Sequence, residues 1–145
     1  VPDESGEPKE IIFLQEDLSL EEAKPLFEDS REKDFEIILE NIGQALVVVD
    51  ENRNVLYCNT RAAGLLDCPS RQTVLGKSVL SWVASSASQQ AIEEFNRLWE
   101  DRGTARMELP LISQKKRRFT AEVNSSILTD STKHRVLMIS LLREV

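Results

Sequence analysis

The feature that most constrains the fold is a segment in which two short apolar runs flank a polar turn. The first run, 45–49, is rich in β-branched residues and the second, 55–58, is equally short, so both are predicted to be β-strands. Between them, Asp50 and the asparagines that follow suit a tight turn, because short polar side chains hydrogen-bond nearby backbone groups and tolerate positive φ angles. Asn59 then stands where a helix needs a cap, before the Ala- and Leu-rich residues 61–66. The segment therefore predicts a β-hairpin followed by a helix.

The rest of the chain continues with helical and then strand-like patterns. Residues 71–83 are typical of short helical turns, and Ser85 or Ser86 is predicted to cap a helix that runs to Asp101 and ends at Gly103. Three strand-like runs follow, at residues 104–112, 117–128 and 134–142. The expected order is strand, strand, helices, strand, strand, strand.

Four of these features, in this order and spacing, resemble the PAS domain family of sensory modules. The first strand ends in Val47-Val48-Val49-Asp50, and the second ends in the aromatic-x-Asn sequence Tyr57-Cys58-Asn59. The helix contains Ala62-Ala63-Gly64-Leu65-Leu66, and Gly76-Lys77 stands where the family usually has Gly-Lys or Gly-Arg. Each piece is weak by itself, and the specificity lies in their combination.

The resemblance covers about residues 35–145 and implies the fold class. We expect an α+β fold, a PAS-like five-stranded antiparallel sheet with helices on one face, preceded by an N-terminal amphipathic helix. Asp67 departs from the family, which commonly has Gly there, although Asp can also take the left-handed conformation that ends a helix. Near the C-terminus, Glu144 replaces the Asp of the Arg-Asp-Ile-Thr motif that often ends such a domain.

The chain is expected to divide into three parts. Residues 1–10 are polar with two prolines and are predicted to be a disordered tail. Residues 11–34 are interpreted as a possible tail of an upstream module and a connector helix, and residues 35–145 as the PAS-like sensory domain. Asp17-Leu18-Ser19 resembles the motif that ends a PAS domain, but residues 11–19 fit equally well as a stray strand. We expect the chain to be an excised piece of a longer protein, and tandem sensory modules are expected if residues 11–19 end an upstream module.

A leading amphipathic helix is predicted to run from about Pro25 to Asn41, with Gly43 after its end. Proline disfavours a helix at the residue before it, so a break or kink is expected at Pro25. The resemblance implies that such a helix packs on the outer face of the sheet or pairs with its copy in a homodimer. The residues predicted to form this dimer or signal helix are Leu26, Phe27, Ile37 and Ile38.

The negative charge of the chain is concentrated in its first third. The net charge of −7 divides into −10 over residues 1–43, with 14 acidic and 4 basic side chains, and +3 over residues 44–145. Because Lys115-Lys116-Arg117-Arg118 is the one basic cluster and lies between two strand patterns, we expect a charged hairpin and no nucleic-acid partner. No apolar run approaches the roughly 20 residues of a membrane span. We therefore expect no membrane segment within this fragment and a cytoplasmic location.

The titratable residues give little support to a bound cofactor, and its identity stays unknown. Haem-binding relatives place a His on the helix before the third strand, whereas residues 86–101 contain none, and His134 is expected at the surface. Flavin-binding photosensory relatives carry a reactive Cys in an Asn-Cys-Arg-Phe-Leu-Gln type motif that this chain lacks. Cys58 and Cys68 have neither metal-ligand nor redox spacing, so we expect reduced thiols, with Cys58 in the core.

Catalysis is not expected of this chain by itself. A Ser-His-Asp arrangement would have to use His134, and no Gly-x-Ser-x-Gly elbow or phosphate-binding Gly-rich loop accompanies it. The resemblance instead implies a ligand cavity between the sheet and the helices. The candidates to line it are Phe95, Trp99, Arg106, Met107, Asn124 and Met138. The plainer alternative is that the aromatic and Met residues are ordinary core, whereas Arg106 and Asn124 could anchor an acidic ligand if they point inward.

The function implied by the resemblance is sensory or regulatory. We expect a domain of a multidomain signal-transduction protein, in the first instance a histidine kinase of a two-component system. Binding of a small molecule or a partner would be relayed through the flanking helices to an output domain of the same chain. The alternative from another class is a ligand-free dimerisation or protein-interaction scaffold in a kinase or transcriptional regulator.

Overall fold

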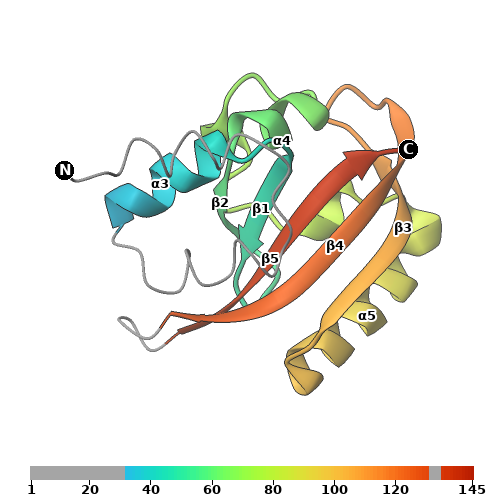
Figure 1. The fold of residues 1–145 in the computed structure, drawn as a ribbon. Coiled ribbons are helices and arrows are strands. Elements are labelled where there is room, and N and C mark those ends of the chain that lie inside the picture. The colour runs from blue at the N-terminus through green and yellow to red at the C-terminus, as the bar shows by residue number, and fades with distance from the viewer. Residues whose placement is uncertain (1–31, 131–134) are drawn as a thin grey trace.

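The computed structural model describes residues 32–130 and 135–145 (Figure 1). The predicted tail 1–10, the segment 11–19, Leu26, Phe27 and His134 lie outside the described residues. Three 3₁₀ turns, labelled η, accompany the helices and strands. The elements are α3 (Glu32–Asn41), β1 (Ala45–Val49), β2 (Val55–Cys58), α4 (Thr60–Leu65), η1 (Arg71–Thr73), η2 (Val79–Trp82), η3 (Ser85–Ala87), α5 (Ser88–Asp101), β3 (Thr104–Ile112), β4 (Arg118–Asp130) and β5 (Arg135–Glu144).

The five strands form one sheet in the order β2-β1-β5-β4-β3, and every neighbouring pair is antiparallel. The last strand of the chain, β5, therefore lies in the middle, between β1 and β4. The hairpin of β1 and β2 has the predicted bounds, as does β3. β4 continues to Asp130 instead of Leu128, and β5 continues to Glu144 instead of Leu142, because their pairing extends to Asp130–Arg135 at one end and to Ala121–Glu144 at the other. The predicted five-stranded antiparallel α+β fold is confirmed.

Alternate residues of each strand face opposite sides of the sheet, and both sides carry a core. On the inner side, Val47 and Met138 pack against Phe95 and Leu98 of α5, which lies behind β3 and β4 in Figure 1. On the outer side, a second cluster joins α3 to β1, β4 and β5. Its buried members are Ile38, Leu39, Ile42, Leu46, Val48, Leu128, Leu137, Ile139 and Leu141. The leading helix thus packs on the outer face, one of the two arrangements implied by the resemblance.

The start of α5 corrects the prediction that Ser85 or Ser86 caps it. Residues 85–87 form the separate turn η3, and the helix begins at Ser88 after Ala87, which makes no capping side-chain bond. At the other end, the left-handed residue is Arg102, with φ 54°, rather than Gly103. Local sequence signals predicted both ends of α5 to within a few residues. They did not separate η3 from the helix, because a 3₁₀ turn and the first turn of an α-helix share the same polar composition.

Candidate functional site

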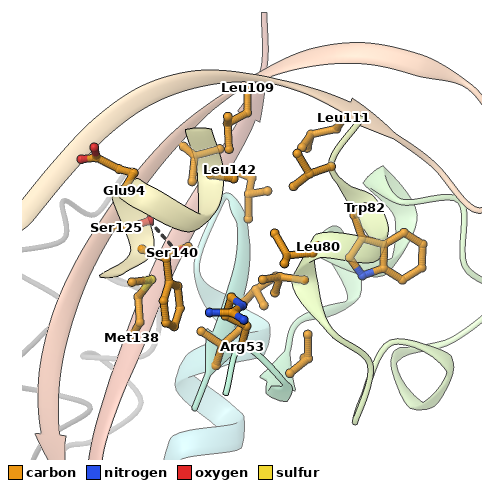
Figure 2. Close-up of a pocket in the computed structure, with 18 of the residues that line it drawn as sticks. Arg53, Leu80, Trp82, Glu94, Leu109, Leu111, Ser125, Met138, Ser140 and Leu142 are labelled. Atoms are coloured by element: carbon orange, nitrogen blue, oxygen red, sulfur yellow. Dashed lines mark hydrogen bonds between the residues drawn. The ribbon is translucent and has the colours of Figure 1, made fainter. Parts of the chain in front are cut away.

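A cavity of about 120 Å³ lies between the inner face of the sheet and the helices. Apolar side chains from α5, the η2 region and all five strands form most of its wall (Figure 2). Among them are Val47, Val55, Leu66, Val74, Val79, Leu80, Val83, Ala91, Phe95, Leu98, Met107, Leu109, Leu111, Val123, Met138 and Leu142. A cavity of this size and composition suits a small, largely apolar molecule.

The residue spacing of α5 explains which side chains reach the cavity. Ala91, Glu94, Phe95 and Leu98 recur at intervals of three and four, so they share one face of the helix. The strands opposite contribute every second residue, as with Met107, Leu109 and Leu111 of β3. The cavity therefore lies between one stripe of α5 and one face of the sheet.

Few polar groups border this apolar space. Ser125 of β4 and Ser140 of β5 are opposite each other, and their hydroxyl oxygens lie 2.7 Å apart in a hydrogen bond. Trp82 is only 6% exposed, and its indole Nε1 has no hydrogen-bond partner. Arg53 enters from the turn between β1 and β2, and its Nε is also buried without a partner. The serine pair is satisfied internally, whereas the Arg53 and Trp82 nitrogens are not.

The predicted cavity residues divide into two groups. Phe95, Met107 and Met138 line the cavity. Trp99 is not part of the wall but supports it, since its ring stacks on Phe95 with the centroids 5.3 Å apart.

Arg106 and Asn124 lie on the opposite face of the sheet, which corrects the expectation that they border the cavity. They face each other across β3 and β4, and Arg106 Nε donates to Asn124 Oδ1 at 3.0 Å. Arg106 also pairs with Glu122 at 3.8 Å, and its side chain is 71% exposed. Their in-chain neighbours Met107 and Val123 point inward, so period-two alternation directs Arg106 and Asn124 outward.

Sequence reasoning missed the polar wall residues Arg53, Glu94, Ser125 and Ser140, together with Trp82. A signal for the serines was available, because they stand two residues after Val123 and Met138 in strands. Arg53 gave no such signal, since a charged residue in a polar turn is expected to point into solvent. Its inward position depends on the packing of η2 and α5 around the turn.

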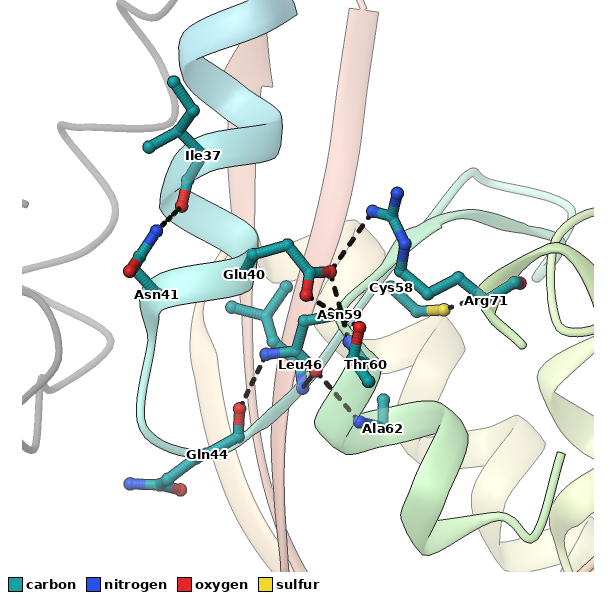
Figure 3. Close-up of polar contacts among 10 residues, drawn as sticks. All are labelled: Ile37, Glu40, Asn41, Gln44, Leu46, Cys58, Asn59, Thr60, Ala62 and Arg71. Carbon is teal, nitrogen blue, oxygen red and sulfur yellow. Dashed lines mark hydrogen bonds and ion pairs between the residues drawn. The ribbon is translucent and has the colours of Figure 1, made fainter. Parts of the chain in front are cut away.

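Asn59 ties the hairpin to the helix that follows it (Figure 3). Its side chain is 1% exposed, and its Oδ1 accepts from the backbone N–H of Leu46 at 3.0 Å and of Ala62 at 2.9 Å. Its Nδ2 donates to the Gln44 carbonyl at 2.8 Å. The predicted helix cap is confirmed, and the same side chain also fixes the start of β1.

Glu40 connects the leading helix to the rest of the domain (Figure 3). Its carboxylate accepts from the Thr60 hydroxyl at 2.7 Å and from the Thr60 backbone N–H at 3.1 Å. It also pairs with Arg71 at 3.2 Å. These contacts connect α3 to α4 and η1, so a movement of α3 would displace both elements.

Cys58 lies near Glu40 and Arg71. Burial raises the pKa of its thiol to about 11, so this cysteine is a protonated core residue at neutral pH.

The predicted dimer or signal-helix residues that the structure describes differ in exposure. Ile38 is buried in the outer cluster, whereas Ile37 is 42% exposed. Ile38 is thus already in contact with its own sheet, and Ile37 is the member of the pair that faces away from it. Leu26 and Phe27 precede the described residues.

Arg117 connects the end of β5 to the end of α4. It lies in the charged turn between β3 and β4, as expected, and pairs with Glu144 at 3.1 Å and with Asp67 at 3.5 Å. Its guanidinium also donates to the Leu65 carbonyl at 3.3 Å and stacks over Phe119. The end of α4, the β3–β4 turn and the end of β5 meet at this one side chain.

Asp67 makes the stability of this junction depend on pH. A hydrogen bond from Ser113 and the nearby Arg117 charge hold the pKa of its carboxyl below the usual value. A carboxyl with a depressed folded pKa stabilises the fold above its unfolded pKa of about 4, and this contribution is lost as the pH falls through the folded value. We expect Asp67→Asn to lower the free energy of unfolding at pH 7, and we expect this effect to shrink progressively as the pH is lowered below about 4, measured by urea denaturation.

Asn is the right replacement because Asp67 has a φ of 58°, the left-handed conformation that Asn also tolerates. The expectation that Asp67 can end its helix in this way is confirmed. As a control, Asp101→Asn removes an exposed carboxylate that makes only a helix-surface pair with Arg97. An equal pH dependence in the two variants would contradict the role assigned to Asp67.

In the two ranges that the structure describes, no helix is long and apolar enough to cross a membrane. The same ranges contain no group of three or more His, Cys, Asp or Glu side chains placed to hold a metal ion.

Comparison with known proteins places the architecture in a described family. A family model described as PAS fold matches residues 39–143. The comparison with curated proteins gives no match.

Solved structures of similar shape agree with this match. A PAS domain from Colwellia psychrerythraea has a TM-score of 0.66 and 15% identity, over 74% of this chain and 90% of its own. A PAS domain of a two-component sensor histidine kinase has a TM-score of 0.65 and 18% identity, over 78% and 95%. A PAS domain in complex with ethanol, from a LuxR-family transcriptional regulator of Burkholderia thailandensis, has a TM-score of 0.59 and 17% identity, over 74% and 93%. At these identities the likeness establishes the fold.

Proposed function

The chain belongs to the PAS domain family, and from this premise we propose that it is a non-catalytic sensory or regulatory domain that binds a small molecule and passes the binding event to an output domain. The parent protein is proposed to be a cytoplasmic multidomain signalling protein. A histidine kinase is the first candidate output, since one similar structure comes from a sensor histidine kinase. A transcriptional regulator is the second, since another comes from a LuxR-family regulator.

The observation that carries this proposal is the apolar cavity of about 120 Å³ between α5 and the sheet. Native interiors are close-packed, so a space of this size lined by apolar side chains suits an apolar molecule. One of the similar structures is described as a complex with ethanol, a small molecule in a domain of the same fold. A bound molecule would contact α5 and the central strands at once.

Contacts around the cavity connect its wall to the helix α3. Val47 and Met138 on the inner face neighbour Val48 and Ile139 on the outer face, where α3 packs. Glu40 adds a polar connection from α3 to Thr60 and Arg71. A ligand that shifts β1 or β5 would therefore bias the position of α3, and the relay is proposed to use this helix.

Native mass spectrometry of the purified 1–145 chain tests ligand binding directly. The expected result is additional mass of a small molecule in the native spectrum that is lost on denaturation, either from the purification or after incubation with a small-molecule library. The variant Ala91→Leu extends a side chain from α5 into the cavity and is expected to abolish this additional mass.

The matched control is Gln90→Leu, which adds the same side chain at the neighbouring exposed position of α5. It should bind as the natural chain does. A chain that gains no mass from any member of the library, in both the natural form and the control, would overturn the proposal.

A second candidate is a ligand-free dimerisation scaffold, favoured by one observation. Ile37 is a large apolar side chain left exposed on α3, on the helix that precedes the sheet. A bare dimer in the native spectrum that becomes monomeric with Ile37→Ser would support this alternative. A homodimer that also carries a ligand would combine the two candidates.

A further inference from the structure

The Arg53 side chain brings a positive charge to the wall of the cavity. Its backbone is held in place, since its carbonyl accepts from the Val79 N–H at 2.8 Å and its φ is 69°. The turn around it is fixed by Asp50, whose Oδ1 accepts from the N–H groups of Asn52 and Asn54, each at 2.9 Å. The turn therefore presents Arg53 to the cavity from a well-supported backbone.

The Arg53 guanidinium lies among apolar groups (Figure 2). Its carbon sits 5.5 Å from the centroid of the Phe95 ring, and its Nε is buried without an acceptor. Among the side chains that the structure describes, those of residues 37–129 and 136–145, no carboxylate forms an ion pair with it. Glu94, the acidic residue of the wall, pairs instead with Arg97, and in Figure 2 its carboxylate points away from the apolar space.

The buried Nε–H of Arg53 lacks an acceptor, which is energetically unfavourable, and an anionic oxygen ligand would supply one. Its planar N–H donors match the two oxygens of a carboxylate, which is the geometry that Arg recognises best. The rest of the wall is mostly apolar, and its two serines bond to each other while Glu94 pairs with Arg97, so the remainder of the ligand is expected to be apolar. A cationic or highly polar ligand would meet the wrong charge or leave its polar atoms unpaired.

Cavity size limits the apolar part. Apolar protein cavities of about 150 Å³ take up benzene, and this one is about 120 Å³, so the apolar body of a ligand is at most the size of a phenyl ring. We propose that the cavity binds a small monocarboxylate with a compact apolar body, no larger than benzoate, with its carboxylate on Arg53. This inference rests on the proposed function, because it assigns a ligand class to the same cavity.

Calorimetric titration of the 1–145 chain with benzoate and with benzamide tests the inference, since the two probes have nearly the same shape and differ in charge. Benzoate is expected to bind at least about tenfold more tightly than benzamide, as a charge-assisted hydrogen bond would give. Arg53→Gln should remove this preference and leave benzamide binding unchanged. Arg106→Gln, which removes an exposed cation on the other face, should retain the preference.

Each other outcome bears on the inference. Equal binding of the two probes, or a preference that survives Arg53→Gln, would overturn the role of Arg53 while leaving a ligand-binding cavity in place. Failure of both probes to bind would overturn the benzoate-sized ligand class, and the mass-spectrometric result then decides the proposed function by itself. If Arg53→Gln does not fold, two other tests replace it. Loss of benzoate binding in Ala91→Leu but not in Gln90→Leu would place the site in the cavity. Arg53→Lys should weaken benzoate binding several-fold, because Lys lacks the paired N–H donors of Arg.

Discussion

Replacing Asn59 with Ala is expected to lower the free energy of unfolding by about 3 kcal/mol, because three backbone groups lose a hydrogen bond together. The Leu46 N–H would lose its acceptor and the Gln44 carbonyl its donor, whereas the Ala62 N–H would lose one of two acceptors and keep the Asn59 backbone carbonyl at 3.1 Å. Each such group left unsatisfied costs about 1–3 kcal/mol, and relaxation or entering water recovers part of the sum. Urea denaturation followed by circular dichroism measures the change.

The matched control is Asn96→Ala, the same substitution at an exposed position of α5. It should change the free energy of unfolding by less than about 0.5 kcal/mol, since Ala is the better helix former and no buried group loses a partner. Asn59→Asp gives a second check. It retains the acceptor for Leu46 and Ala62 but sets an oxygen against the Gln44 carbonyl, so it should also destabilise at pH 7. Asn59→Ala no more destabilising than the control would refute the structural role given to this residue.

Asn59 also shows why this part of the fold is predictable from the sequence. A helix cap, a two-strand hairpin and a turn built on Asp50 are local, so each is encoded within a few neighbouring residues. The sheet order, with β5 between β1 and β4, joins residues almost a hundred positions apart, as in the pair Ala45 and Leu142. Hydrophobic periodicity cannot specify such a pairing, and the resemblance to a known family implied a five-stranded antiparallel sheet without giving the order of its strands.

The cavity was predictable only in part, for a reason visible in β3. Arg106 and Met107 are adjacent in a strand, so they cannot both face the same side of the sheet. Met107, Leu109 and Leu111 form an apolar alternation that already assigns Arg106 to the other face. Arg53 is different, since a turn has no such alternation. Its inward position results from tertiary packing against Val79 and Phe95, which no local pattern contains.

The second large effect is expected on α3, the helix proposed to relay the signal. Leu39 is 0% exposed and packs with Leu46, Val48 and Ile139 on the outer face of the sheet. Leu39→Ala is expected to lower the free energy of unfolding by about 2–5 kcal/mol, the usual range for removing a buried Leu side chain. Urea denaturation measures the loss, and amide hydrogen exchange of residues 37–42 shows whether α3 opens before the sheet does.

Ile37→Ala is the matched control, because it removes a similar apolar volume from the exposed side of the same helix. This substitution should lower the free energy of unfolding by less than about 1 kcal/mol in a monomer.

The Leu39→Ala measurements also distinguish two hypotheses about α3. If Leu39→Ala destabilises the whole domain in one transition, α3 belongs to the same cooperative unit as β1 and β5, and a ligand acting on those strands can bias it. If only the exchange of residues 37–42 accelerates and the sheet is unaffected, α3 is an independent appendage, and the relay through it would have to be abandoned.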